Sequence, residues 1–294
     1  MEIKRIGIIA NSEKKEAGVY TTQLKKWAMQ RGIEVSLETG IAEKLGEKEG
    51  FERHDLASRV DVAVVFGGDG TLIKAARSLR EYDVPILGVN LGSFGYLTVF
   101  NRHELYDAME MIIRGDYRIE TRMMLDAVVT RDGEQVSENT VLNDAVINQG
   151  NPFRLVDLET FVDDCYLTTF RADGLIVSTP TGSTAYSLSA GGPIIFPQLN
   201  SIIINPICPH TLTNRPVILP ESASIRILSW TETGRATLTY DGQVFFVMNK
   251  GDVVTVKKSK YCTKLIVSPH RDYLEILRSK LGWGGWPSGI SNGS

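Results

Sequence analysis

The chain has 294 residues, of which 43% are hydrophobic and 23% are charged, and its formal net charge is −3. This length fits two domains of about 150 residues each, and the composition is typical of a soluble globular protein. The weak negative charge provides no basic field for nucleic acid or acidic lipid, so we expect neither as a partner.

The cysteines and the first residues predict a cytoplasmic protein. Cys165, Cys208 and Cys262 are widely spaced and form no C-x-x-C pair, which favours a reducing compartment over a disulfide framework. No run reaches about 18 consecutive apolar residues, so no membrane-spanning helix is expected. The N-terminus lacks a signal-peptide pattern, and residues 286–294 are expected to form a flexible tail.

The first third of the chain alternates strands with helices. Strands are predicted at 3–10, 33–37, 60–66 and 84–89, and helices at 19–30, 72–79 and 104–113. Residues 41–53 are polar and predict no element. This alternation is typical of a Rossmann-like parallel α/β domain. Ligands bind such sheets beyond the carboxyl ends of the strands, where the glycine-containing loops 66–71 and 90–95 fall.

From about residue 118 the pattern changes to short strands with turn signals such as Asp132-Gly133 and Asp241-Gly242. The predicted strands are 119–130, 140–148, 155–162, 167–171, 175–178, 201–205, 224–230, 236–240, 244–248 and 253–257, with a helix-like interruption at about 183–189. This pattern predicts an antiparallel, β-sandwich-type domain.

The end of the chain suits the layers of the first domain better than those of the second. It offers a lone strand, 265–267, and a helix, 273–281, which we expect to return to the α/β domain. The expected domains are therefore 1–118 plus 265–285, and 119–264.

The run Gly67-Gly68-Asp69-Gly70-Thr71 stands between a predicted strand and a helix. Its glycines let the backbone approach a ligand, and their N–H groups can face a phosphate at the helix N-terminus. A carboxylate repels phosphate, so Asp69 suggests work on a proton or a metal ion. The alternative is a tight strand-to-helix turn in which Asp69 caps the helix or tolerates a left-handed backbone.

The run 172–193 is rich in Ser and Thr and contains Tyr186. Hydroxyl groups and backbone N–H groups around a helix start suit a polar or anionic ligand, and the alternative is an ordinary capped helix. Asn143 and Asp144 are adjacent in a predicted strand, so both reach one ligand only at a strand end or a bulge. The alternative is an ordinary strand-end turn.

Arg154 and Arg171 are isolated basic residues near these runs. Either side chain could hold a diphosphate through bidentate contacts, and the alternative for each is a surface ion pair. The four histidines show no pattern of a catalytic or metal site, so we assign them no role.

Taken together, these runs resemble the ATP-NAD kinase family, and the likeness extends from about residue 3 to residue 281. The matching segments are Gly67–Thr71, Leu142–Asp144, Asp173–Pro193, Pro209–Pro216 and Asp241–Gln243. The glycine loop alone is shared with diacylglycerol, sphingosine and 6-phosphofructo-kinases. The run Thr179–Tyr186 is far more specific.

The resemblance implies phosphorylation of the adenosine ribose 2′-hydroxyl of NAD by ATP with a divalent metal such as Mg²⁺. Asp69 would then take the proton from that hydroxyl, and Gly67, Gly68 and Gly70 would cradle phosphate. The residues expected to bind NAD are Asn143, Asp144, Arg154, Arg171, Asp173, Thr184, Ala185, Tyr186, Ser187, Leu188, Ser189 and Gln243. The family usually has Glu at the position of Asp144. A site between the domains and a homo-oligomer, a dimer or tetramer, are further expectations.

Two rival functions are a lipid kinase of the same superfamily and a non-catalytic NAD sensor. A lipid kinase should carry a membrane-directed feature such as a basic amphipathic helix, and none is evident in the sequence. A sensor would not need an acid at the position of Asp69.

Overall fold

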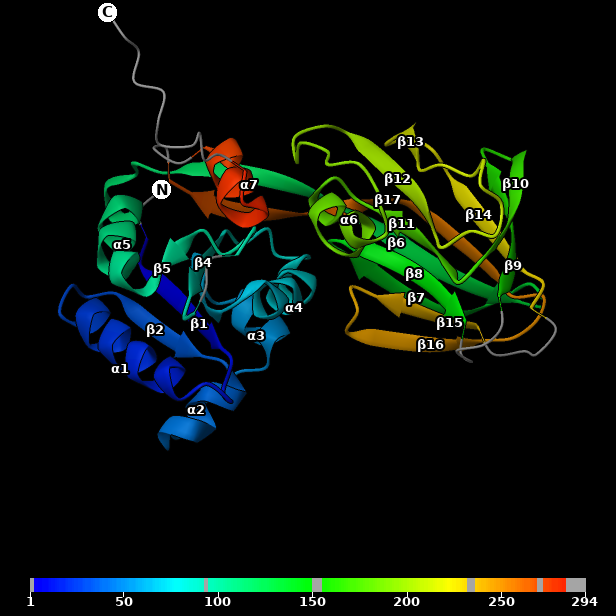
Figure 1. The fold of residues 1–294 in the computed structure, drawn as a ribbon. Coiled ribbons are helices and arrows are strands. Elements are labelled where there is room, and N and C mark those ends of the chain that lie inside the picture. Colours follow the sequence, from blue (N-terminus) through cyan, green and yellow to red (C-terminus); the bar gives the residue numbers. More distant parts are fainter. Residues whose placement is uncertain (1–2, 93–94, 150–154, 232–235, 269–271, 284–294) are drawn as a thin grey trace, which may run out of the picture. The chain divides into compact units, whose positions relative to one another are not determined.

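The computed structural model describes residues 3–92, 95–149, 155–231, 236–268 and 272–283 (Figure 1). The chain divides into two compact units, unit 1 with residues 1–72, 84–120 and 265–294, and unit 2 with residues 73–83 and 121–264. Two sequence predictions, the role of Arg154 and the tail 286–294, lie outside the described residues.

Unit 1 is a parallel α/β fold. Its elements are β1 (Arg5–Ala10), α1 (Lys15–Met29), β2 (Glu34–Leu37), α2 (Thr39–Leu45), α3 (Arg53–Ala57), β3 (Val62–Gly67), the start of α4 (Asp69–Leu79), β4 (Ile86–Asn90), β5 (Phe100–Asn101), the 3₁₀ turn η1 (Arg102–Glu104), α5 (Leu105–Arg114), the end of β17 (Val253–Val267) and α7 (Tyr273–Leu281). The strands lie in the order β17-β4-β3-β1-β2, all parallel, with β5 beside β4.

The apolar, β-branched runs of β1 and β3 form the centre of this sheet. Ile6, Ile8 and Ile9 are fully buried, as are residues 62–66. Helix α1 packs against β1, β2 and β3. The expected parallel sheet, and the return of the last strand and helix to it, are confirmed. In a sheet of this strand order the ligand crevice lies at the carboxyl ends of β1 and β3.

Three features of unit 1 were not predicted. The polar stretch 41–53 contains most of α2 and the start of α3, short helices that bury only a few apolar side chains such as Ile41 and Leu56. The two-residue strand β5 has no sequence signal of its own. Helix α4 begins at Asp69 rather than Leu72, and the carbonyl of Gly68 accepts hydrogen bonds from the N–H groups of Thr71 and Leu72.

Unit 2 is a β-sandwich. Its elements are residues 73–79 of α4, most of β6 (Arg118–Arg131), β7 (Glu134–Val141), β8 (Asp144–Gln149), β9 (Val156–Val162), β10 (Cys165–Ala172), β11 (Gly174–Ser178), the 3₁₀ turn η2 (Thr181–Thr184), α6 (Tyr186–Ser189), β12 (Ser201–Ile207), β13 (Val217–Pro220), β14 (Ile225–Ser229), β15 (Ala236–Tyr240), β16 (Val244–Met248) and most of β17.

One layer of the sandwich has the order β10-β9-β14-β17, with β6 paired to both β17 and β7. The other has the order β13-β12-β11-β8-β15-β16, and all its neighbours are antiparallel. Alternate side chains of both layers, such as Leu158 and Val254 facing Leu175 and Leu238, share one buried core. The expected β-sandwich is therefore confirmed.

Two strand predictions in this part of the chain are wrong in detail. The predicted strand 140–148 is divided into β7 and β8 by Leu142 and Asn143, whose N–H groups bind a carboxylate instead of a neighbouring strand. The predicted strands 253–257 and 265–267 are one strand, β17, because the lysine-rich stretch between them buries Ser259 and Thr263 on alternating positions. Strand β13 was not predicted.

Candidate nucleotide-binding and catalytic site

Asp69 is held by the loop that follows β4. Its Oδ1 accepts hydrogen bonds from the N–H groups of Leu97 (3.1 Å) and Thr98 (2.9 Å) and from Oγ1 of Thr98 (2.9 Å). Its Oδ2 accepts one hydrogen bond, from the N–H of Tyr96 (2.7 Å). Because a carboxylate offers about four lone-pair sites, two on each oxygen, the remaining acceptor capacity lies on Oδ2.

A second contact orders the same loop. Nδ2 of Asn90, the last residue of β4, donates to Oγ1 of Thr98 (2.9 Å), so the hydroxyl proton is directed to Asp69. A Cβ at Gly95 would overlap both Oδ1 of Asp69 and Oγ1 of Thr98. The carboxylate of Asp69 therefore lies against backbone that only glycine permits at this point.

The predicted phosphate-facing glycines differ in their surroundings. A Cβ at Gly67 would overlap the side chain of Thr71, so Gly67 is required by the packing of α4 on β3. A Cβ at Gly68 would meet no atom of the described residues within 4 Å, and Gly70 is exposed. The helix start at Asp69 therefore presents open space beside Gly68, at the end of the helix where the dipole favours an anion.

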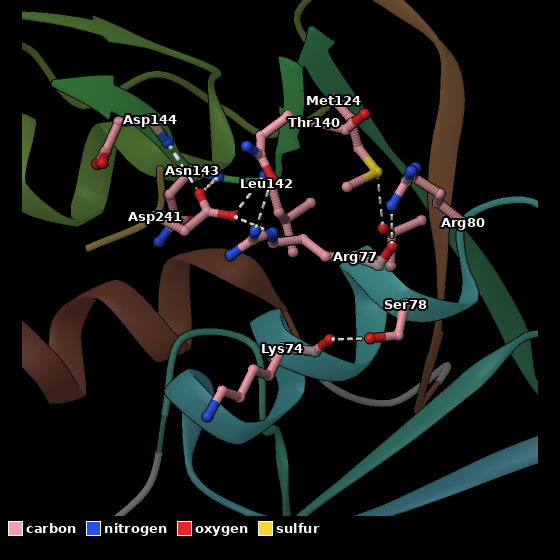
Figure 2. A network of polar contacts seen from close by, with 12 residues as sticks. Lys74, Arg77, Ser78, Arg80, Met124, Thr140, Leu142, Asn143, Asp144 and Asp241 are labelled. Carbon is pink, nitrogen blue, oxygen red and sulfur yellow. Dashed lines mark hydrogen bonds and ion pairs between the residues drawn. The ribbon is translucent and has the colours of Figure 1, made fainter. Parts of the chain in front are cut away.

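In unit 2 the carboxylate of Asp241 binds three consecutive N–H groups (Figure 2). Its Oδ2 accepts from Leu142 (3.0 Å), and its Oδ1 accepts from Asn143 (2.7 Å) and Asp144 (3.2 Å). We call residues 142–144 the acidic corner. Asp144 is the first residue of β8, so the strand-end position that Asn143 and Asp144 need to reach one ligand is present.

Both acids of this region are removed from water. The Asp241 side chain is 0% exposed, and burial raises its pKa, while the three N–H groups and Arg77 act in the opposite direction. Nε of Arg77 lies 3.9 Å from Oδ2 of Asp241. Asp144 is 4% exposed, and burial followed by the charge of Asp241 raises its pKa to about 7. Figure 2 shows the Asp144 carboxyl group pointing away from that of Asp241.

The carbonyl groups of the acidic corner are bound by the start of the hydroxyl-rich run. Oγ1 of Thr179 donates to the carbonyl of Leu142 (2.7 Å), and the N–H of Thr179 and Oγ of Ser178 donate to that of Asn143 (2.9 and 3.1 Å). A Cβ at Gly182 would overlap that same Asn143 carbonyl. The corner is thus fixed from both sides.

Several hydroxyl groups of the run 172–193 therefore serve the fold. Ser178, Thr179, Ser183 and Ser187 are fully buried and hydrogen-bonded within the unit. Of the residues in this run that are predicted to bind NAD, Asp173, Thr184, Ala185, Tyr186, Leu188 and Ser189 remain at least partly exposed. A ligand contact from the side chain of Ser187 stays a prediction, as do the contacts from these six.

The remaining residues predicted to bind NAD, Asp173, Gln243 and Arg171, lie at different places in the fold. Oδ1 of Asp173 accepts from Gln149 (3.4 Å) between β10 and β11. Gln243 follows the Asp241-Gly242 turn, and its N–H donates to Tyr240 (3.0 Å). Arg171 is 65% exposed and lies 3.9 Å from Asp157, as in the surface ion pair that was its alternative. A ligand contact from Arg171 stays a prediction.

Sequence reasoning missed Arg77, Thr98 and the anchoring role of Asp241. Asp241 was noticed only as half of a turn signal and as part of a family motif. One local signal could have drawn attention to Arg77. It is a cation in a helix that also contains the buried residues Leu72, Ala76 and Leu79. Thr98 has none, since its contact with Asp69 spans 29 positions of the chain.

The parallel α/β unit carries a glycine loop and an acid that begins a helix, and the β-sandwich carries an acidic corner. Together these features define a phosphotransferase of the kinase type. Residues 6–117 match the ATP-NAD kinase N-terminal domain, and residues 142–268 match the ATP-NAD kinase C-terminal domain. The chain belongs to the ATP-NAD kinase family.

Individual relatives agree with this assignment. The chain is 49% identical to an NAD kinase of Syntrophotalea carbinolica, over 96% of this chain and 99% of that protein. It is 46% identical to an NAD kinase of Geobacter sulfurreducens, with the same shares covered. Yeast NADH kinase, solved with NADH, superposes with a TM-score of 0.88 at 25% identity, covering 100% of this chain and 91% of that one.

The fold is also similar to that of an NAD kinase from Archaeoglobus fulgidus solved with ATP, with a TM-score of 0.76 at 22% identity over 96% of this chain and 100% of that one. Within the part of the chain that the structure describes, no helix is both long and apolar enough to cross a membrane.

Proposed function

We propose that this protein is an NAD kinase, which transfers the terminal phosphoryl group of ATP to the 2′-hydroxyl of the adenosine ribose of NAD and forms NADP. The observation that carries this proposal is the oriented carboxylate of Asp69 at the start of α4, beside the open space at Gly68. The names of the relatives support the same reaction, since the curated relatives at 41–49% identity are NAD kinases.

In this proposal Asp69 is the general base. Its Oδ1 is saturated by three donors, so Oδ2 takes the proton of the attacking hydroxyl. A positioned base contributes about 10²–10⁴-fold to such a step. The backbone of Gly67, Gly68 and Gly70 binds phosphate, because N–H groups and the helix dipole at this end stabilise negative charge.

The acidic corner binds the ribose in this proposal. Asn143 supplies an amide, and Asp144 supplies acceptors for ribose hydroxyl groups. Because the pKa of Asp144 is raised to about 7, its carboxyl group is part protonated near neutral pH in the free protein. The exposed or half-exposed Asp173, Thr184, Tyr186, Ser189 and Gln243 complete the dinucleotide contacts that we propose.

We further propose that a divalent metal, Mg²⁺, enters together with ATP. Among the described residues no group of three or more His, Cys, Asp or Glu side chains is arranged to hold a metal ion. Mg²⁺ is commonly held by one or two carboxylates together with substrate phosphates, and the open space beside Gly68 at the start of α4 is compatible with such a partly substrate-borne ion. The metal would neutralise charge on the phosphates.

The test is an assay with NAD, ATP and Mg²⁺, read by an NADP-specific dehydrogenase, with inorganic polyphosphate and NADH as alternative substrates. We expect NADP formation from NAD and ATP. Binding of NAD without any NADP would instead indicate a sensor. Phosphorylation of diacylglycerol or sphingosine in vesicles, with no NADP, would indicate a lipid kinase.

We also propose a cytoplasmic protein that assembles into a homo-oligomer, a dimer or tetramer. Strand β16 forms one edge of its sheet and exposes Phe245 (72%) and Val247, an apolar edge that a second copy of the chain can cover. Sedimentation equilibrium measures the assembly directly, and a monomer at micromolar concentration would rule it out.

A further inference from the structure

The proposed chemistry leaves the buried pair of Arg77 and Asp241 without a role. Arg77 lies two turns along the helix that Asp69 begins, and its side chain is only 13% exposed. Its Nε lies 3.9 Å from Oδ2 of Asp241, and its Nη2 donates to Oδ1 of Asn139 (3.4 Å), a residue of β7. Figure 2 shows the guanidinium group directed at Asp241.

The turn between β15 and β16 directs Asp241 toward the acidic corner. Asp241 and Gly242 have φ values of 52° and 62°, and the N–H of Gln243 donates to the carbonyl of Tyr240 (3.0 Å). Positive φ at both central residues is the type I′ hairpin turn, which Asp-Gly favours. A residue without a short polar side chain would carry strain at φ 52° and would not supply the carboxylate.

The carboxylate replaces a strand as the hydrogen-bond partner of the N–H groups of residues 142–144. Three consecutive N–H groups converge on it, which is the arrangement of a backbone anion nest. This is also the point at which the predicted strand 140–148 is divided into β7 and β8. The direction in which Asn143 and Asp144 project therefore depends on Asp241.

We infer that Asp241 and Arg77 are positioning residues of the dinucleotide site, which fix the acidic corner so that the Asn143 and Asp144 side chains are directed at the ribose. Neither residue touches the substrate in this inference, and both act through the backbone of the corner. The inference rests on the proposed function, because the ribose contacts of Asn143 and Asp144 belong to it.

The unit contains a matched pair that serves as control. Arg131 binds the fully buried carboxylate of Asp252 through Nε and Nη2, both at 2.8 Å, and Asp252 also accepts from the N–H of Asn249 (2.8 Å). This second Arg–Asp pair, with a buried carboxylate and a half-buried Arg131, holds the β16–β17 turn, and none of its residues is among those proposed to bind NAD. Substitutions in either pair should therefore lower the stability of the protein, whereas only substitutions of Arg77 or Asp241 should lower the affinity for NAD.

The experiment compares Asp241→Asn, Arg77→Met and Arg77→Lys with Asp252→Asn in the full chain. Asp241→Asn turns one acceptor into a donor that faces N–H groups. The hydrogen bond lost in this way costs about 1–3 kcal/mol, which corresponds to a factor of about 5 to 150 in an equilibrium constant. We expect kcat/KM for NAD to fall about 10- to 100-fold, mainly through KM, with KM for ATP within about twofold of the wild-type value. Arg77→Lys keeps the charge and should recover more of this loss than Arg77→Met.

Amide hydrogen exchange at residues 142–144 is the second readout. We expect it to accelerate in Asp241→Asn and to remain at the wild-type rate in Asp252→Asn. A wild-type KM for NAD in Asp241→Asn, with ATP kinetics and folding intact, would overturn the positioning role. If Asp241→Asn does not fold, equal NAD affinities of wild type, Arg77→Lys and Arg77→Met overturn it instead. If the wild-type protein makes no NADP, the proposed function is wrong, but the positioning role is not thereby overturned. The exchange rates at residues 142–144 then still decide whether Asp241 fixes the acidic corner.

Discussion

Asp144 and Asp241 are joined by hydrogen bonds in both directions. The N–H of Asp241 donates to the carbonyl of Asp144 (2.9 Å), and the N–H of Asp144 donates to Oδ1 of Asp241 (3.2 Å). Two buried acids therefore share one corner, but only Asp241 has its carboxylate among N–H donors. Burial and the charge of Asp241 act together on Asp144 and raise its pKa to about 7.

This arrangement predicts that Asp144→Asn stabilises the free protein at neutral and higher pH. The pKa of Asp144 is raised by folding from 3.8 to about 7, so the folded state binds the proton more tightly than the unfolded state. The contribution of Asp144 to the free energy of unfolding is therefore most favourable below about pH 4, falls as the pH rises, and levels off above about pH 7. The difference amounts to up to about 4 kcal/mol.

Urea unfolding from pH 4 to pH 8 measures this effect. Asp144→Asn should flatten the decline in unfolding free energy, and the exposed Asp164→Asn should retain the wild-type slope, because the Asp164 side chain is 94% exposed. Identical slopes in wild type and Asp144→Asn would show that Asp144 ionises normally. The same variant should bind NAD more weakly, so that stability and affinity change in opposite directions.

The parts of this site that sequence predicts are those with local signals. The Asp69 loop lies between a β-branched run and an apolar helix, and the Asp241-Gly242 turn is a strong hairpin signal, so both appear in the pattern. The break at Leu142 and Asn143 does not, because the cause lies about 100 positions away in the carboxylate of Asp241. The hydroxyl-rich run is conspicuous, yet its pattern does not tell the buried Ser178 and Thr179 from the exposed Tyr186.

Asp69→Asn should abolish most turnover while NAD still binds. The amide oxygen can keep the contacts with Leu97 and Thr98, but the amide cannot serve as a base, so kcat should fall at least about 100-fold. The matched control is Asp61→Asn, because Oδ2 of Asp61 also accepts two backbone N–H groups, from Lys4 and Arg5, both at 2.9 Å. Asp61→Asn should keep the wild-type rate.

Steady-state kinetics and NAD titration calorimetry on both variants decide this point. A kcat within threefold of wild type in pure Asp69→Asn would remove Asp69 from the base role. Loss of NAD binding together with turnover would place Asp69 in binding instead.

Gly95→Ala should impair turnover without any change to the charge of the site. The added Cβ would overlap Oδ1 of Asp69 and Oγ1 of Thr98, so the carboxylate must rotate or the loop must shift. Misplacement of a reacting group by about 1 Å can cost about 100-fold in rate. Gly40→Ala is the control, since its Cβ has only Oγ of Ser12 at 3.8 Å and alanine favours the helix α2. Full activity in Gly95→Ala would mean that the orientation of Asp69 is not needed.

Gly68→Ala should separate phosphate binding from folding at the same loop. The added Cβ meets no atom within 4 Å in the described ranges of the chain, and the φ of Gly68 lies outside the left-handed region, so the unfolding free energy should change by no more than about 1 kcal/mol. If a phosphate of ATP occupies that space, the methyl group must displace it, and KM for ATP should rise at least about tenfold with KM for NAD unchanged. Gly67→Ala provides the contrast, because its added Cβ overlaps the side chain of Thr71. The main effect of Gly67→Ala should therefore be a lower stability of the fold. Thermal unfolding and ATP kinetics on the two variants distinguish these effects. A wild-type KM for ATP in a stable Gly68→Ala protein would place the phosphates elsewhere.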